Sequence, residues 1–495
     1  MKGKLKLLLV FPEVAPFAKT GDLGEVGGTF PKALKELGHD VRVIMPQYRV
    51  INERKYILRD VIRLQNIDVS LGKESVKVNV KSAFLPNSKV QVYFIDYKPF
   101  FFRQGLYSDP KTGKDYPDND KRFALFARGV LETLVKLQWQ PDVIHCHDWQ
   151  SALVPFFLKT LNKNDPFFAK TFSLFTIHDF SSQGDFDSDC VSSLGLNNNF
   201  VFEGSSIDFH GRCNFLKAGI ISADVVNTVS EKYAEEVQSA HDYGFGMEEI
   251  LRERGNSFYS VINGIDYKEW NPAADNLIPG KYDVNDISGK KKNKYTLLEK
   301  YRLPFSEKVP VVVMILPSVD QKGIDLVKNA LDAMMRLNIY FIVLGKDREL
   351  NYKFFDKIKK KYKNKLETDP DFDNSLAHLV TAGADIILMP SKVEPCGLTQ
   401  LCALRYGTVP LVRLTGGLAD TVKPFDPETE KGTGFAFNNL NIKELLKTLK
   451  QAVKFFQDQK TWAKIMKNGM REDFSWDTSA RKYVQLYSKC LAKNK

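Results

Sequence analysis

The clearest chemical signal in the sequence is the stretch MPSKVEPCGLTQ at residues 389–400. Glu394 stands in a loop between a predicted buried strand and a predicted helix. Gly397, Leu398 and Thr399 open that helix, where backbone amides have no intrahelical acceptor. Such amides, with the positive end of the helix dipole, suit a diphosphate. The stretch therefore predicts a phosphate site with a carboxylate beside it.

A second candidate is the glycine-rich turn PFAKTGDLGEVGG at residues 16–28, which follows the first predicted strand. Glycine lets the backbone approach a ligand closely, and Lys19 and the amides near Gly21 favour phosphate oxygens. The same pattern is also a common structural turn between a strand and a helix, with Lys19 an ordinary loop lysine. By itself the turn leaves both interpretations open.

Polar side chains also follow two further predicted strands. Their carboxylate, imidazole, amide and indole groups suit carbohydrate hydroxyls, although helix caps and hydrogen-bonded strand-end histidines have the same appearance. These candidates are Asp148, Trp149, Gln150, His178 and Asp179.

His145 and His147 raise the question of a metal pair. We expect them on opposite sides of their strand, and we find no third ligand at metal-site spacing. The two histidines therefore do not predict a metal site.

Short apolar runs alternate with helical patterns along the whole chain, which is typical of βαβ units and a mainly parallel sheet. Strands are predicted at residues 5–11, 40–45, 90–95, 142–145, 172–177, 225–228, 309–316, 340–344, 385–389 and 409–412. Helices are predicted at residues 30–37, 122–137, 324–337, 353–365, 375–382 and 398–406.

The polar segment at residues 263–294 lacks periodicity and predicts a connection between two domains. Two doubly wound domains in sequence place ligands at the carboxyl ends of both sheets. The predicted fold is therefore α/β, with two Rossmann-like domains that face each other across a cleft, and the connection is a candidate hinge.

The formal net charge of +11 favours anionic partners. Lysines gather at residues 290–294 and 353–365, and we interpret both runs as solvated faces. Since no nucleic-acid motif accompanies them, nucleic-acid binding is the weaker hypothesis. The six cysteines lack CxxC spacing and are expected to be reduced. The basic start and apolar run at residues 1–11 fit a first strand better than an export signal, and no run predicts a membrane span.

Ten collinear blocks resemble the bacterial glycogen synthase and plant starch synthase family, a group of retaining two-Rossmann (GT-B) glucosyltransferases. They are KTGDLGEVGGTFPKAL, GHDVRVIMPQY, PDVIHCHDWQSALVP, FTIHD, NFLKAGIISAD, VINGIDYKEWNPA, DQKGIDL, SLAHLVTAGAD, MPSKVEPCGLTQLCALRYGTVP and TGGLADTV, with FSWDTSARKYVQLY as a final helix. The resemblance implies an acceptor-side domain at residues 1–265, a nucleotide-sugar donor domain at 266–470, and a helix at 471–495 returning to the first.

The resemblance also implies a cytoplasmic enzyme that moves glucose, usually from ADP-glucose, to an α-1,4-glucan without a metal. Lys19 and Lys322 would contact the donor phosphates, together with amides near Gly21 and from Gly397 to Thr399. Glu394 would bind the sugar 3- and 4-hydroxyls. His178 would lie near the 6-hydroxyl, Asp148 would serve the sugar or acceptor side, and Phe372 would stack on the base.

The chain departs from this family at several positions. Pro317 stands where an arginine usually precedes the catalytic lysine, Asp22 replaces a glycine after Lys-Thr-Gly, and Asp179 replaces an asparagine. The turn at residues 344–347 is one residue short, and Lys346 is a candidate substitute cation. Three hypotheses follow: an active synthase using ADP-glucose, the same enzyme with UDP-glucose, or a degenerate homologue that binds or regulates glucan.

Overall fold

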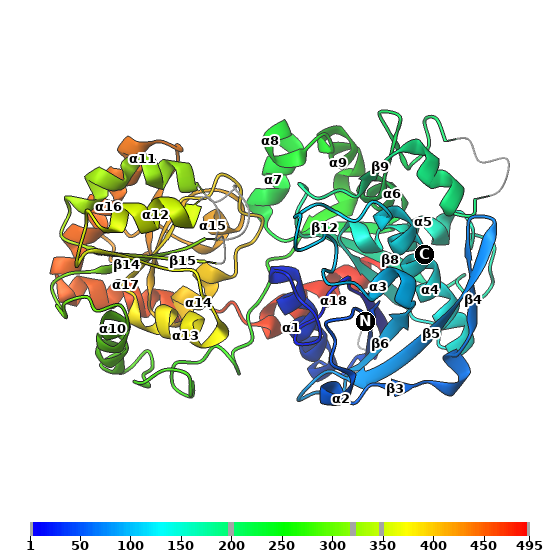
Figure 1. The fold of residues 1–495 in the computed structure, drawn as a ribbon, viewed down its shortest axis with the longest axis horizontal. Coiled ribbons are helices and arrows are strands. Elements are labelled where there is room, and N and C mark those ends of the chain that lie inside the picture. The colour runs from blue at the N-terminus through cyan, green and yellow to red at the C-terminus, as the bar shows by residue number, and fades with distance from the viewer. Residues whose placement is uncertain (1–2, 197–201, 317–322, 346–350, 493–495) are drawn as a thin grey trace. The chain divides into compact units, whose positions relative to one another are not determined.

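The structure is a computed structural model that describes residues 3–196, 202–316, 323–345 and 351–492. The chain forms two compact units, drawn in Figure 1, which are described separately below. Unit 1 comprises Met1–Gly264 and Trp476–Lys495, and unit 2 comprises Ile265–Ser475. Among the helices in the described ranges, none has the length and apolar character that a membrane span requires.

Unit 1 is built on one large sheet. Its strands within the described residues are β1 (Lys6–Val10), β2 (Asp40–Pro46), β3 (Arg59–Asp60), β4 (Ile67–Leu71), β5 (Glu74–Phe84), β6 (Gln91–Asp96), β7 (Val143–His147), β8 (Phe172–Ile177), β12 (Val225–Thr228) and β13 (Phe258–Ser260). A small antiparallel sheet contains β9 (Asp185–Phe186), β10 (Asp208–Phe209) and β11 (Arg212–Asn214).

The large sheet has the order β13-β12-β8-β7-β1-β2-β6-β5-β3, with β4 paired to β5. The strands from β13 to β6 are parallel, and β5 adds antiparallel pairs at one edge. Since β1 pairs with both β2 and β7, the winding reverses between β1 and β7. The carboxyl ends of these two strands form the switch point where doubly wound sheets bind ligands.

The helices of unit 1 cover this sheet. They are α1 (Asp22–Glu36), α2 (Glu53–Tyr56), α3 (Lys98–Phe101), α4 (Asn119–Leu137), α5 (Leu153–Lys159), α6 (Phe215–Ser222), α7 (Glu231–Ser239), α8 (His241–Gly244), α9 (Glu248–Arg254) and α18 (Trp476–Ala492), with 3-10 turns η1 (Ile62–Leu64), η2 (Trp149–Ser151), η3 (Ser188–Ser193) and η4 (Gly255–Ser257).

Unit 2 has a parallel sheet of the order β16-β15-β14-β17-β18-β19 in its described part. Its strands are β14 (Val311–Leu316), β15 (Tyr340–Gly345), β16 (Leu366–Asp369), β17 (Ile386–Met389), β18 (Val409–Arg413) and β19 (Phe435–Phe437). Its helices are α10 (Gly289–Lys300), α11 (Ile324–Met335), α12 (Asn351–Lys359), α13 (Asn374–Gly383), α14 (Thr399–Arg405), α15 (Gly416–Thr421), α16 (Ile442–Gln457) and α17 (Gln459–Arg471).

The central strand of unit 2 shows how its residues build two apolar layers. Val312 and Met314 of β14 pack in the core cluster that includes α11, α16 and α17. Val311 and Val313 pack in the other cluster, with α10 and α13. Alternate residues of a strand point to opposite faces, so a continuous apolar run such as β14 needs both layers. The fold class of two doubly wound α/β domains is confirmed.

Several sequence predictions about single elements are wrong. The first helix starts at Asp22 rather than at residue 30, because its glycines pack against the preceding turn: a Cβ at Gly27 would lie 2.7 Å from the Glu13 carbonyl oxygen. The helix predicted at 353–365 ends at Lys359. The edge strands β3, β4 and β5 were not predicted.

The lysines at residues 290–294 are not uniformly solvated, which corrects a second prediction. Within this run, which lies in α10, Lys290 and Lys294 are each 6% exposed. Lys290 Nζ donates to the Ala382 carbonyl and the Thr408 hydroxyl at 2.9 and 2.7 Å, and Lys294 pairs with Asp385 at 2.8 Å. The predicted connection therefore ends inside unit 2 as a packed helix.

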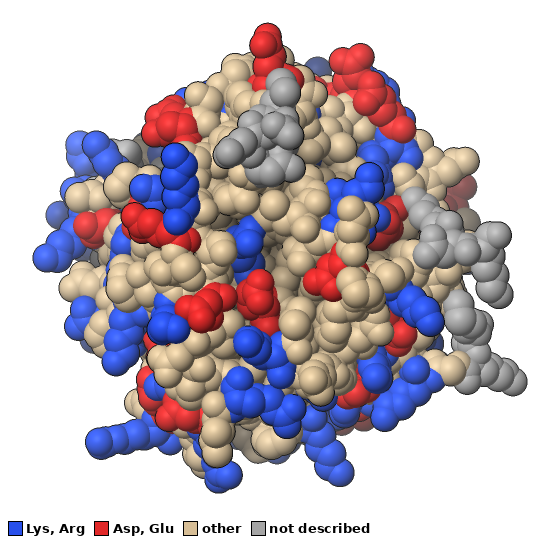
Figure 2. All heavy atoms as spheres, turned by 90° about the vertical axis from the view of Figure 1, so that its right-hand side faces the viewer, with Lys and Arg blue, Asp and Glu red and all other residues tan. Residues whose placement is uncertain are grey.

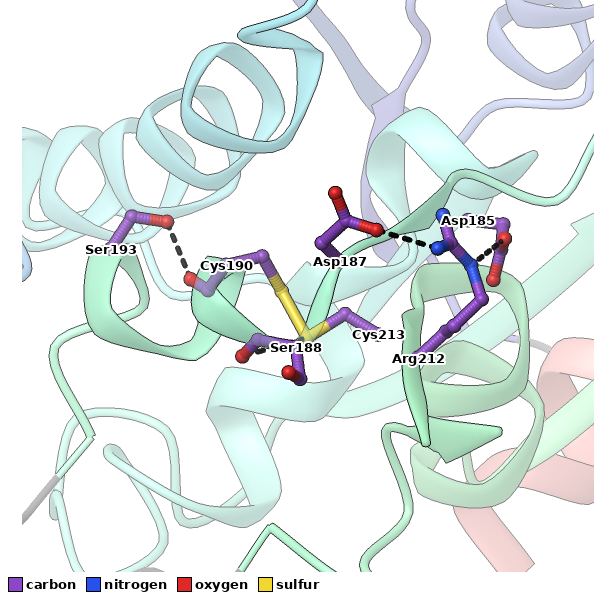
Figure 3. Close-up of a disulfide and its surroundings, with 7 residues drawn as sticks. All are labelled: Asp185, Asp187, Ser188, Cys190, Ser193, Arg212 and Cys213. Atoms are coloured by element: carbon purple, nitrogen blue, oxygen red, sulfur yellow. Dashed lines mark hydrogen bonds and ion pairs between the residues drawn. A yellow bond between two sulfur atoms is a disulfide. The ribbon is translucent and has the colours of Figure 1, made fainter. Parts of the chain in front are cut away.

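The expectation of six reduced cysteines is wrong for one pair. Cys190 of η3 and Cys213 of β11 form a disulfide, shown in Figure 3. The small sheet brings them together, because β11 pairs with β9 just before η3. The other four cysteines, Cys146, Cys396, Cys402 and Cys490, are buried thiols that are not part of this disulfide.

Candidate functional site

Asp148 lies at the switch point of unit 1, immediately after β7. Its Oδ1 accepts a hydrogen bond from the His178 amide at 2.6 Å, which joins the ends of β7 and β8. Burial raises the pKa of Asp148 to about 8, and the nearby carboxylates of Asp179 and Glu13 act in the same direction. Four of the polar groups at this edge, including one not predicted, are thus close enough to interact.

Glu13 is the group that the sequence analysis missed. Its buried carboxylate accepts from the Thr20 amide and hydroxyl at 2.7 and 2.8 Å and from the Gly24 amide at 3.1 Å. Burial raises the pKa of Glu13 despite these hydrogen bonds. Amides of the glycine-rich turn that seemed available for phosphate therefore already bind an internal carboxylate. The sequence signal that could have identified Glu13 is its place two residues after the apolar run at residues 5–11, at the carboxyl end of the first strand.

Lys19 remains at the surface of this turn, with half of its side chain exposed, and forms an ion pair with Glu25 of α1. Gly21 lies in open space, since a Cβ there would meet no atom within 4 Å. Asp22 occupies the first turn of α1. In this geometry an anionic ligand that binds Lys19 competes with Glu25.

His178 is partly buried at the end of β8, and desolvation lowers its pKa to about 3. Its Nε2 lies 3.1 Å from His147 Nδ1, and its Nδ1 lies 3.5 Å from Asn263 Nδ2. The Oδ1 of Asn263 is buried and has no hydrogen-bond partner among the described residues. From the sequence, Asn263 was only the first residue of the predicted connection. Its burial beside His178, which makes it a candidate site residue, is visible only in the structure.

The prediction that His145 and His147 lie on opposite sides of their strand is wrong. His145 and His147 are two residues apart on β7, so they share a face of the sheet, and their ring centroids are 4.1 Å apart. His145 is bonded through both nitrogens, to Tyr487 at 2.9 Å and to Thr176 at 2.7 Å. In the described ranges no group of three or more His, Cys, Asp or Glu has a metal-binding arrangement.

Trp149 and Gln150 lie beside Asp148 but are buried in η2. The Trp149 indole donates to Ser182 at 3.0 Å, and its ring packs edge-on against Phe123 at 4.9 Å. The Oε1 of Gln150 has no partner within the described chain. The structure therefore places Trp149 in the core behind the polar groups.

Glu394 lies at the corresponding edge of unit 2, after β17. Its carboxylate is 3% exposed and accepts from Ser391 Oγ at 2.8 Å. The start of α15 fixes its backbone, because the Gly417 amide donates to the Glu394 carbonyl at 3.0 Å. A Cβ at Gly416 would lie 2.0 Å from that same oxygen. Glu394 is thus held by both its side chain and its main chain.

Gly397, Leu398 and Thr399 follow Glu394 and lead into α14, as predicted. Gln400 fastens this loop, because its Nε2 donates to the Cys396 and Gly397 carbonyls, each at 2.9 Å. Phe372 lies between β16 and α13, partly buried against the core. Lys322, Pro317 and Lys346 lie outside the described residues.

Two family models match the chain. Residues 6–253 match the starch synthase catalytic domain, and residues 298–470 match the glycosyl transferases group 1. The glycogen synthase of Thermotoga petrophila is 41% identical over 492 residues, which cover 99% of each chain. The glycogen synthase of Desulforudis audaxviator is 40% identical over 498 residues, covering 99% of this chain and 97% of that one.

A solved structure shows the same fold. The catalytic domain of starch synthase IV from Arabidopsis thaliana, bound to ADP and acarbose, matches with a TM-score of 0.90 and 30% identity, over 99% of this chain and 100% of that chain. With the full-length relatives and the family models, this match assigns the two α/β domains to the GT-B type. The chain therefore belongs to the glycogen and starch synthase family of glycosyltransferases.

Proposed function

We propose that this chain is a cytoplasmic glycogen synthase, which transfers glucose from ADP-glucose to the non-reducing end of an α-1,4-glucan with retention of configuration. The carrying observation is the full-length identity of 40–41% to glycogen synthases. The buried groups at the carboxyl edges of both sheets support it, because they match the residues that the family resemblance assigned to donor and sugar.

In this proposal unit 1 supplies the acceptor side and unit 2 the donor side. Glu394, oriented by Ser391, binds sugar hydroxyls as a fixed hydrogen-bond acceptor. Asp148, His178 and Asp179 serve the sugar and acceptor. We add Asn263 to the sugar site, since its buried Oδ1 has no hydrogen-bond partner among the described residues.

The departing diphosphate gains negative charge in the transition state, and preorganised donors stabilise it. Lys19, Lys322 and the amides of Gly397, Leu398 and Thr399 have this role in the proposal, and Phe372 contacts the base. No metal or cofactor is needed by this mechanism. On the face shown in Figure 2, the basic and acidic side chains are interspersed and do not form the continuous basic stripe that a single-stranded nucleic acid would follow.

The test is release of ADP from ADP-glucose by the purified protein with glycogen present, beside the same assay with UDP-glucose. Glu394→Ala and the matched Glu394→Gln, which keeps the shape and removes the charge, should both abolish release. Release that survives in both variants contradicts the assigned role of Glu394.

Pro317 favours a second function, that of a glucan-binding or regulatory homologue. The proline replaces an arginine side chain that would donate charged hydrogen bonds to the phosphates. This function predicts no ADP release with either donor but retained glycogen binding. Pro317→Arg should then restore measurable ADP release, because the loss of one such hydrogen-bond donor costs about 10² to 10³-fold in rate elsewhere.

A further inference from the structure

His147 is a buried histidine for which the mechanism above has no use. It is fully buried at the end of β7, and its Nδ1 lies 3.1 Å from Nε2 of His178. Burial lowers the pKa of both rings well below the ordinary value, so each ring carries one proton at neutral pH. Only one of the two facing nitrogens can therefore donate in the hydrogen bond between them.

The orientation of the Asn263 side-chain amide bears on which of the two ring nitrogens donates. Its Nδ2 faces Nδ1 of His178 at 3.5 Å, and an amide N–H is only a donor. With the amide in this orientation, Nδ1 of His178 faces a donor, and we assign the proton of this ring to Nε2. His178 then donates to His147 Nδ1, and the proton of His147 is on its own Nε2.

The surroundings of His147 hold its ring by packing. It stacks on Phe11 with ring centroids 3.8 Å apart and an interplanar angle of 12°. Its Nε2 is buried and has no hydrogen-bond partner in the described ranges. A buried N–H without an acceptor destabilises the folded protein, so this histidine is poorly suited to a purely structural role.

His145 provides the contrast. It lies two residues earlier on the same strand and is equally buried, but both of its nitrogens are bonded, to Tyr487 and Thr176. Its hydrogen bonds join β7 to α18 and to the neighbouring strand β8, as expected of a structural histidine. No hydrogen bond is described between the His145 and His178 rings, which makes His145 the matched control.

We propose that His147 is a positioning residue that accepts the Nε2 proton of His178 and thereby keeps His178 Nδ1 as a hydrogen-bond acceptor beside the Asn263 amide. A hydroxyl both donates and accepts, so it can donate to Nδ1 and accept from the amide. The 3.5 Å contact is longer than an ordinary hydrogen bond, so a sugar hydroxyl can replace it at small cost. This part of the inference rests on the proposed function.

The kinetic test compares ADP-glucose with its 6-deoxy analogue as donors in the wild type, in two variants of His147 and in one control variant of His145. His147→Phe keeps the stack on Phe11 and removes the acceptor, whereas His147→Asn keeps an acceptor near Nδ1. His147→Phe should lower kcat/KM for ADP-glucose by about 10- to 100-fold and lose most of the preference over the analogue. His147→Asn should recover most of both.

The control His145→Asn should lower thermal stability and leave the preference between the two donors unchanged. Full discrimination by folded His147→Phe overturns the proposal. So does an equal loss of discrimination in His145→Asn, since that result assigns the effect to packing.

A second measurement needs no activity. Long-range ¹H–¹⁵N spectra of the unliganded, histidine-labelled protein, which contains seven histidines, report which ring nitrogen carries the proton. His178 should be protonated on Nε2 in the wild type and in a mixture of tautomers in His147→Phe. A wild-type His178 protonated on Nδ1 overturns the proposal, whereas absence of ADP release with the expected tautomer contradicts only the proposed function.

Discussion

Asp148 carries two destabilising features at once. Its backbone has φ 57° and ψ 175°, a conformation that residues with a side chain rarely adopt and that costs about 1–3 kcal/mol. Its side chain is partly buried, and desolvation raises the pKa of its carboxyl to about 8. Such costs collect at functional positions, because the surrounding fold imposes them. The backbone of Asp148 therefore supports its assignment to the site independently of the family resemblance.

The pKa of Asp148 leads to a prediction about stability and pH. The folded protein holds this proton between the ordinary pKa near 4 and about 8, whereas the unfolded chain has released it. The free energy of unfolding therefore falls as pH rises through this window. Asp148→Asn does not titrate, so its unfolding midpoint relative to wild type should increase as pH rises.

The measurement is the midpoint of thermal unfolding of both proteins from about pH 5 to about pH 8, where one proton contributes at most about 1.4 kcal/mol per pH unit. The neighbouring carboxyl groups of Asp179 and Glu13 are present in both proteins, so the difference between the two curves is the informative quantity. Parallel curves would contradict the raised pKa.

At the scale of elements, the disulfide fastens the segment from β9 to α6. Asn214 follows Cys213, accepts from the Lys217 amide at 2.8 Å at the start of α6, and donates to Gln183 at 2.8 Å. Arg212 of β11 pairs with Asp185 and Asp187, as Figure 3 shows. These contacts tie the disulfide to the chain that follows His178 and Asp179.

Loss of the disulfide should destabilise this segment. Cys190 and Cys213 are 23 residues apart, and closing a loop of this size contributes about 3 kcal/mol. The double variant Cys190→Ser with Cys213→Ser should unfold at lower temperature and be cleaved faster by protease between residues 185 and 214. Wild type treated with a dithiol should behave like the variant, and thiol labelling of both cysteines without reductant would refute the bridge.

The start of α15 provides a second prediction at this scale. A Cβ at Gly417 would lie 1.9 Å from the Cys396 carbonyl oxygen, so alanine must displace the loop that carries Glu394. Gly417→Ala should lower kcat by about 10²-fold or more, because small displacements of a reacting group are costly. Far-UV circular dichroism should change little.

The matched control for Gly417→Ala is Gly129→Ala in α4, where a new Cβ would meet ordinary contacts at 3.5 Å from Ile95. Alanine also favours helix over glycine, so this variant should keep full activity. Equal activity of the two variants would show that the close approach at α15 does not position the site.

At the scale of the whole molecule, α18 belongs to unit 1 although it follows all of unit 2 in sequence. Trp476 stacks on Phe30 at 5.0 Å, Tyr483 is bonded to Asn227 at 3.1 Å, and Tyr487 to His145 at 2.9 Å. Unit 1 therefore needs residues that follow all of unit 2 in the sequence.

Truncation after Ser475 should remove the cooperative unfolding transition of unit 1, because it exposes Phe30 and leaves His145 and Asn227 without their tyrosine partners. Calorimetry on the truncated chain should retain the transition of unit 2. Tyr487→Phe, which removes one hydroxyl, should cost only about 1–3 kcal/mol. A truncated protein with both transitions intact would contradict this dependence.

The sequence by itself determined the fold class, most buried strands and the position of Glu394. Apolar runs such as β8 and β14 were predicted as strands from the sequence, because the pattern and the length of an apolar run are local properties. The family resemblance added the expected roles of Lys19, His178 and Glu394, which remain proposals.

Only the tertiary structure decided which distant groups meet. The Glu13 carboxylate accepts hydrogen bonds from amides of the glycine-rich turn. Asn263 lies beside His178, although 85 residues separate them in the sequence. The bridge between Cys190 and Cys213 depends on strand pairing in the small sheet. Local propensity contains no information about such contacts, since they arise when the sheet order brings the ends of separate strands together.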